Sequence, residues 1–294
     1  MPVNRMMRQV LLGTTLLCSL PVTAQIGQSS GSAAGGKDSA DALLRLAIPK
    51  TMRNREKALA FTYDIAYRNR NYSTQGELLA DYTAKYEMVF IEGLPFRKLT
   101  EENHRPLTGK SLEQEQKRYD QAFEERSRMS VDEKRSYLRR ERNLDIPFQL
   151  LPELFTSKVE GMDVVGGRPA VVVDCTPREN LSGDASVADE ERQRALRKQV
   201  KLWIDRQDLV VSRMEATLLA DDAELQKGST ATIEFIRQDG TWLPERTDVQ
   251  FSTKAGVQVV RGDTEEANSH FQRFRVDVRL LDGGEVASQS RSAN

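Results

Sequence analysis

Cysteine, histidine and tryptophan are scarce in this sequence, with two of each among 294 residues. A zinc site would need both histidines together with carboxylates, so no metal or other cofactor is expected. Cys18 falls in the N-terminal leader described below, which leaves Cys175 as the only other cysteine and predicts no internal disulfide. Cys175 lies in the apolar run 170–175, which favours a buried, inert thiol over a reactive or intermolecular one.

The sequence also lacks an excess of either charge. The 43 Lys and Arg residues are balanced by 44 Asp and Glu residues, for a formal net charge of −1. Nucleic acid is therefore not an expected partner, because its phosphates are bound through a basic excess. Beyond the leader, no apolar run is long enough to span a bilayer, so the chain is expected to be peripheral to a membrane at most.

Catalytic patterns are weak where they occur. Residues 27–31 have the spacing of a nucleophile elbow, and residues 31–37 have that of a P-loop, but no strand precedes either one. The acidic clusters at 184–191 and 221–222 lack the ligand spacing of a calcium loop. No enzymatic activity is predicted, although a hydrolase stays open because Ser-His-Asp triads are spatial arrangements.

The N-terminus has the pattern of a secretory signal peptide. Arg5 and Arg8 precede a short apolar stretch at 10–20, and Val22-Thr23-Ala24 offers small residues for cleavage before Gln25. Cys18 follows leucine, which does not fit a lipoprotein signal. The predicted organisation is a signal peptide at 1–24, a flexible linker at 25–37, a single β domain at 38–281 and a disordered tail at 282–294. The predicted location is periplasmic or secreted.

Hydrophobic periodicity predicts a helix followed by long strands. Asp38 or Ser39 caps a helix expected to end before Pro49, and alternation begins at residue 59. From Leu78 to Phe90 the apolar residues keep one parity for thirteen residues, which indicates a long, half-buried strand. Gly93-Leu94-Pro95 breaks it, and a short strand is expected at 96–99.

A charged helical insert is predicted at 106–143. Ser111 with Gln114, and Ser130 with Glu133, match the capping-box pattern and indicate helices at 111–128 and 131–142. Their apolar content is low, so the insert is expected to lie over the domain without forming its core.

Further hairpins are predicted after the insert. They pair 155–165 with 169–175, 200–205 with 209–219 and 230–236 with 242–251, the last across Gln238-Asp239-Gly240; strands at 257–260 and 271–280 follow. The polar stretch 177–191 is expected to be a mobile loop. Nine or ten antiparallel strands define an α+β fold built on one large, curved antiparallel sheet.

Four segments resemble a known family. Leu202-Trp203-Ile204-Asp205, continued to 216, and the segment 239–246 are similar to a hairpin and the following strand of the bacterial periplasmic lipoprotein carriers of the LolA/LolB type. The segments 92–107 and 161–172 resemble an uncharacterised group of exported bacterial proteins related to those carriers. The insert at 106–143 departs from the carrier pattern, and the carriers' lid-tethering arginine has no identifiable counterpart.

The resemblance implies a half-open β-barrel with helices on its concave side, in which family members hold lipoprotein acyl chains. A lipid or lipoprotein acyl chain is thus an expected partner, bound for carriage or sensing; an envelope protein is another, if the core is filled and the chain is an interaction module. The candidates for the ligand-binding concave face are Tyr86, Met88, Phe90, Leu202, Ile204, Met214 and Phe235.

Overall fold

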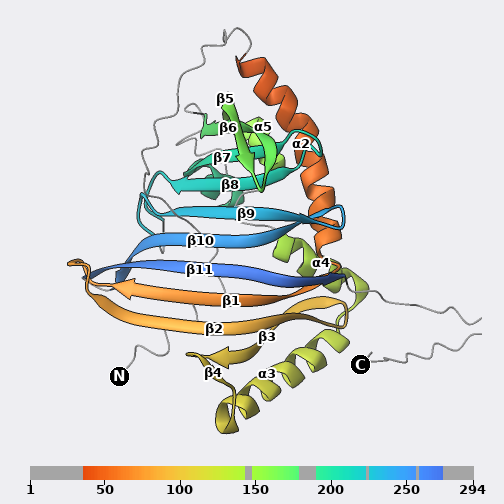
Figure 1. Cartoon of the computed structure of the whole chain (residues 1–294), viewed down its shortest axis with the longest axis vertical. Coiled ribbons are helices and arrows are strands. Elements are labelled where there is room, and N and C mark those ends of the chain that lie inside the picture. Colours follow the sequence, from red (N-terminus) through yellow and green to blue (C-terminus); the bar gives the residue numbers. More distant parts are fainter. Residues whose placement is uncertain (1–35, 143–147, 179–189, 223–224, 256–257, 274–294) are drawn as a thin grey trace, which may run out of the picture.

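The computed structural model describes residues 36–142, 148–178, 190–222, 225–255 and 258–273, and they form one curved antiparallel sheet with helices (Figure 1). The eleven strands follow the order β4-β3-β2-β1-β11-β10-β9-β8-β7-β6-β5, and the sheet does not close on itself. The predicted α+β half-barrel is confirmed. The strands are β1 (Phe61–Tyr72), β2 (Leu78–Ile91), β3 (Leu94–Glu102), β4 (Arg105–Pro106), β5 (Phe155–Val165), β6 (Arg168–Pro177), β7 (Lys198–Asp205), β8 (Val211–Leu218), β9 (Thr230–Gln238), β10 (Thr241–Ala255) and β11 (Gln258–Arg273).

The described helices lie outside the sheet plane and are mostly short. They are α2 (Gly36–Ala58), α3 (Gly109–Ser127), α4 (Val131–Arg142), the 3₁₀ turn η1 (Phe148–Leu150), α5 (Leu151–Leu154) and α6 (Glu190–Leu196). The two insert helices were predicted almost to the residue, and Ser130 and Glu133 form the expected reciprocal cap. At α3 the cap residue is Thr108, with Ser111 as its partner, rather than Ser111 with Gln114.

Predicted boundaries were wrong in two elements. Residues 258–260 and 271–273, from the strands expected at 257–260 and 271–280, belong to a single strand, β11, which passes through Gly262 without a break; residues 257 and 274–280 lie outside the described residues. Helix α2 begins at Gly36, before the expected caps Asp38 and Ser39, and it does not end before Pro49 but continues to Ala58. Pro49 lies on the exposed side of the helix, while the buried side continues beyond it, so packing outweighs the lost helical hydrogen bond.

Polar side chains attach the second half of α2 to the sheet. Thr51 Oγ1 accepts a hydrogen bond from the Val211 amide at 3.1 Å. Asn54 donates to the Trp242 carbonyl at 2.7 Å and accepts from the Trp242 amide at 2.8 Å, as a neighbouring strand would. The Thr51 bond attaches α2 to the start of β8. The two Asn54 bonds attach α2 to the start of β10, a part of β10 with which β11 does not pair.

Helix α3 lies along β3, which forms the edge of the sheet except at residues 101–102, where β4 pairs with it (Figure 1). Its side chains bond the backbone groups of that edge: Glu115 accepts from the Leu99 amide at 3.0 Å, and Arg126 donates to the Leu94 carbonyl at 3.0 Å. Arg118 donates to the Arg97 carbonyl. The insert therefore covers a sheet edge that would otherwise be open to pairing with another chain.

The predicted signal peptide and the predicted tail at 282–294 lie wholly outside the described residues. The linker lies outside them except for its last two residues, and the loop at 177–191 lies outside them except for its ends.

Candidate functional site

The strand register places all seven predicted ligand-binding residues on one face of the sheet, called here the inner face. Directly paired residues share a face, and the pairs connect Ala84, Tyr67, Glu266, Thr247, Ile233, Met214 and Leu202 in one row from β2 to β7. Alternation along each strand then puts Tyr86, Met88 and Phe90 on this face with Ile204 and Phe235.

Helices fill one half of the inner face. Leu202, Ile204 and Met214 are at most 2% exposed and pack with Leu44 of α2 in a closed core, against which Phe235 is also packed. The turn η1 and helices α5 and α6 contribute to the same core. Leu202, Ile204 and Met214 are therefore core residues in this structure, and Phe235 is partly buried against them.

The other half of the inner face, over β11, β1, β2 and β3, carries aromatic side chains that are only partly buried. Tyr67 meets Tyr82 and Tyr86 edge-on, with ring centroids 6.3 and 6.4 Å apart, and Tyr63 contacts Phe271 at 5.3 Å. Met88 is 9% exposed, and Phe90 is half-buried. We call this set, which comprises Tyr63, Tyr67, Tyr82, Tyr86, Met88, Phe90 and Phe271, the tyrosine surface.

An ion pair crosses the tyrosine surface. Arg97 of β3 reaches over β2 and β1 to Glu266 of β11, with Nη1–Oε2 and Nη2–Oε1 distances of 2.8 and 3.1 Å. The Arg97 side chain is 47% exposed, against 15% for Glu266, so solvent reaches the Arg97 end of the pair.

The tyrosines on the same face as this ion pair are partly buried, and this burial affects their acid–base properties. Burial raises the pKa of Tyr67, Tyr82 and Tyr86. Burial also lowers the pKa of Arg97, but the charge and hydrogen bonds of Glu266, together with the nearby Tyr63 and Tyr86, outweigh it and leave that pKa above its ordinary value. Sequence patterns did not predict Arg97 or Glu266 as site residues. One signal for Arg97 was present: it lies two residues before Leu99 on a half-buried strand, so both side chains are expected on the same face.

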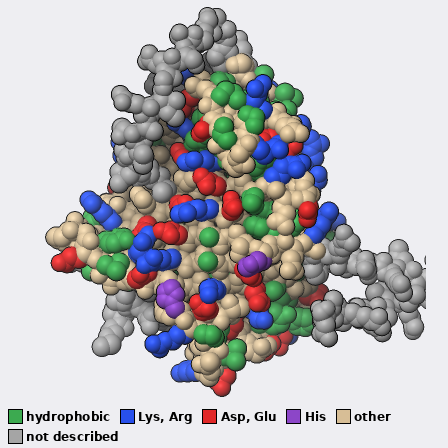
Figure 2. Space-filling model, in the orientation of Figure 1, with side chains coloured by type: hydrophobic (Ala, Val, Ile, Leu, Met, Phe, Trp, Pro, Cys, Tyr) green, Lys and Arg blue, Asp and Glu red, His purple; other side chains and the backbone are tan. Residues whose placement is uncertain are grey.

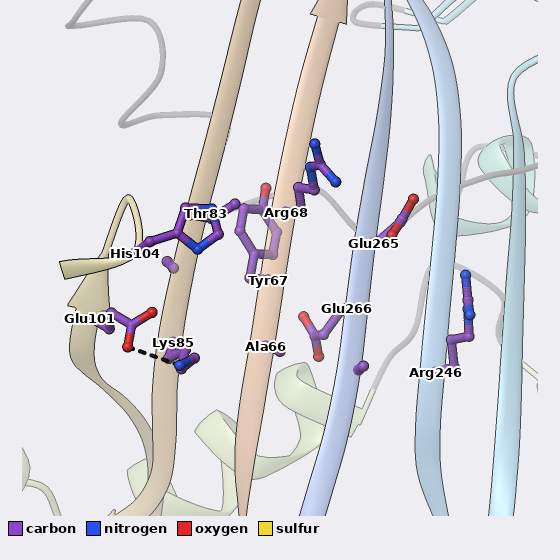
Figure 3. Close-up of a pocket in the computed structure, with 12 residues that line it drawn as sticks. Ala66, Tyr67, Arg68, Thr83, Lys85, Glu101, His104, Arg246, Glu265 and Glu266 are labelled. Carbon is purple, nitrogen blue, oxygen red and sulfur yellow. Dashed lines mark hydrogen bonds and ion pairs between the residues drawn. The ribbon is translucent and has the colours of Figure 1, made fainter. Parts of the chain in front are cut away.

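The opposite, outer face has an open pocket of about 240 Å³ on the same strands, with both apolar and charged residues in its lining (Figure 3). The small side chains of Ala66 and its pair Ala267 lie at its centre, between Lys85 and Arg246. Lys85 is paired with Glu101 at 2.9 Å. Figure 2 shows charges of both signs spread across this face, which is typical of a solvated sheet surface.

Residues from three of the four segments that carry the family resemblance meet in one structural cluster. Arg168 makes two hydrogen bonds with the Asp205 carboxylate, at 2.7 and 2.9 Å, and its guanidinium lies over the Trp242 ring. Trp242 Nε1 donates to Asp208 at 2.9 Å, as Arg237 Nε does at 2.7 Å. These motif residues join three hairpins, so in this structure their role is to hold the fold.

The described residues contain one Ser-His-Asp cluster without the geometry of a catalytic triad. His270 Nδ1 lies 2.8 Å from Asp64 and 3.5 Å from Ser269 Oγ, so both neighbours meet the same ring nitrogen. The His270 and Asp64 side chains are 77% and 54% exposed. Cys175 is buried, and burial raises the pKa of its thiol to about 12.

The described part of the chain offers neither a metal site nor a membrane-spanning helix. Among those residues, no group of three or more His, Cys, Asp or Glu side chains could hold a metal ion. None of their helices is long and apolar enough to cross a membrane.

No protein-family model matches this chain, and neither does any curated protein. Among solved structures it is similar to a DUF1329 family protein from Desulfovibrio piger, with 11% identity over 82% of this chain and 95% of that one and a TM-score of 0.30. A putative outer membrane lipoprotein-sorting protein domain from Vibrio parahaemolyticus has 11% identity over 81% and 95%, with a TM-score of 0.35. A LolA superfamily protein from Nitrosomonas europaea has 12% identity over 79% and 94%, with a TM-score of 0.30.

These neighbours include a LolA superfamily protein, the type of protein that the sequence motifs resemble. With such low identities and TM-scores, no ligand, partner or residue role is carried over from them.

Proposed function

We propose that this chain is a non-enzymatic binding protein of the cell envelope, which holds the apolar part of a lipid or lipoprotein against the tyrosine surface. The observation that carries the proposal is the division of the inner face. Helices complete the core over β5 to β9, whereas aromatic side chains over β1, β2 and β11 stay partly exposed on the same face. Partly exposed aromatic residues gathered on one surface are typical of binding sites.

Burial of an acyl chain would supply the affinity. Each buried methylene contributes about 0.8 kcal/mol, so even eight or nine of them supply about 7 kcal/mol before the costs of association. Tyrosine rings suit this task, because each combines a large apolar area with a hydroxyl group that can contact water or a polar group.

Native mass spectrometry of the exported protein, purified without detergent, tests the proposal. A bound mass that extracts into organic solvent as an acyl lipid is the expected result. A bare polypeptide that takes up neither added fatty acid nor lipopeptide would refute it and favour an interaction module with a filled core.

Variants locate the ligand on the sheet. Tyr86→Ala and Phe90→Ala each remove aromatic area from the tyrosine surface and are expected to weaken lipid uptake at least tenfold. Leu79→Ala is the matched control, since Leu79 is 59% exposed on β2 and lies outside the surface. Equal losses in all three variants would show that the ligand does not lie on the tyrosine surface.

A further inference from the structure

The ion pair between Arg97 and Glu266 lies at the centre of the surface assigned to the apolar ligand. Ile65 and Ala84, on the two strands that it crosses, are 1% and 4% exposed. A purely apolar ligand would have to lie beside two charges, which is costly unless they remain paired.

Arg97 keeps hydrogen-bonding capacity beyond this pair. A guanidinium has five N–H donors, and Glu266 accepts from two of those of Arg97. The paired geometry shows that the guanidinium can hold a planar carboxylate in a two-pronged arrangement from the inner face. The half-buried rings of Tyr67 and Tyr86 lie on the same face, and an acyl chain laid over them would exclude water and strengthen the attraction of Arg97 for an anion.

Glu266 has the chemistry of such an anion but belongs to the protein. Its carboxylate meets Arg97 only because the two side chains stretch toward each other from strands separated by β2 and β1. The carboxylate of an amphiphile lying on the tyrosine surface could approach the 47% of Arg97 that is exposed.

We propose that Arg97 binds the carboxylate of a fatty-acid-like ligand through its exposed donors, while Glu266 holds Arg97 in place and competes with the ligand for its charge. This inference rests on the proposed function and narrows the ligand to an anionic amphiphile. It makes Glu266 an internal competitor, so removal of its charge strengthens ligand binding.

The test compares a fluorescent fatty acid, cis-parinaric acid, with its methyl ester, which has the same acyl chain without the charge. Both are titrated into the wild-type protein and into Arg97→Gln, Arg97→Lys and Glu266→Gln variants. The quantity measured is the ratio of acid affinity to ester affinity, which cancels any general loss of the apolar surface.

In Arg97→Gln this ratio is expected to fall by roughly tenfold or more, because a charge-assisted, two-pronged contact is lost. Arg97→Lys keeps the charge but not the planar fork, so its ratio is expected to fall less. In Glu266→Gln the ratio is expected to rise. Arg68→Gln is the matched control: Arg68 makes an equivalent two-pronged pair with Asp81 on the outer face, and its ratio is expected to stay at the wild-type value.

Two results would overturn the inference and leave the proposed function standing: an acid-to-ester ratio unchanged by Arg97→Gln, or one that falls in Glu266→Gln. Failure of both probes to bind the wild-type protein would overturn the inference and the proposed function together.

Discussion

Replacement of Asp205 is expected to destabilise the fold through loss of a buried, multiply bonded carboxylate. Asp205 is 1% exposed and accepts two hydrogen bonds from Arg168. It also accepts from the backbone amides of Gln207 at 3.0 Å and Asp208 at 2.7 Å, which fixes the turn between β7 and β8.

The size of the effect follows from which of these bonds a variant keeps. Asp205→Asn retains an oxygen for the turn amides but loses the charge and one acceptor for Arg168, which is 26% exposed and can turn to water. We expect a loss of about 2 kcal/mol. Asp205→Ala leaves the amides and the guanidinium without their partner, and we expect about 3–4 kcal/mol.

Urea unfolding followed by circular dichroism measures both values. The matched control is Asp239→Asn, at an exposed position in the turn between β9 and β10, which is expected to stay within about 0.5 kcal/mol of the wild type. If Asp205→Asn lies in the same range as this control, the Arg168 pair contributes no stability and the reasoning fails.

The Asp205 carboxylate is also expected to make the free energy of unfolding depend on pH. Burial raises the pKa of Asp205, but the hydrogen bonds from Arg168, Asp208 and Gln207 outweigh it and set that pKa below its ordinary value. Because the pKa of Asp205 is lower in the folded state than in the unfolded state, its carboxylate stabilises the fold at pH values above the unfolded-state pKa of about 3.9. This stabilisation is lost as the pH falls through the folded-state pKa. The difference in unfolding free energy between wild type and Asp205→Asn is therefore expected to shrink from pH 6 to pH 3; a constant difference would contradict this assignment.

Two further predictions concern close packing and the sheet edge. A Cβ atom on Gly262 would lie 2.4 Å from the Phe251 ring, so Gly262→Ala is expected to cost about 1–3 kcal/mol in thermal unfolding. Gly161→Ala, where no atom lies within 4 Å, is its control, and equal losses would refute the packing argument. Glu115→Gln removes the charged acceptor of the Leu99 amide and is expected to speed hydrogen exchange there; unchanged exchange would show that α3 does not protect the β3 edge.

Local signals in the sequence were sufficient for most elements. The alternation from Leu78 to Phe90 predicted both β2 and the face that carries Tyr86, because a strand has a fixed two-residue period. Asp239 and Gly240 predicted the turn between β9 and β10, and both have the positive φ angles, 49° and 74°, that such a tight hairpin needs.

What the sequence could not reveal depends on contacts between distant residues. Helix α2 continues past Pro49 because Thr51 and Asn54 bond strands more than 150 residues further along the chain. Arg97 and Glu266 look like surface charges in their local context, and only the strand order brings them to the same surface. For the same reason, sequence patterns did not distinguish Leu202, inside the closed core, from Tyr86, outside it.

The pairing of β1 with β11 brings an early strand of the chain beside the last one described (Figure 1). Closing such a long loop carries a large entropic cost, and folds rich in distant pairings form slowly. During synthesis, β1 to β4 have no partner on the β1 side until β11 has been made. We therefore expect the nascent chain to remain without its complete sheet through most of translation.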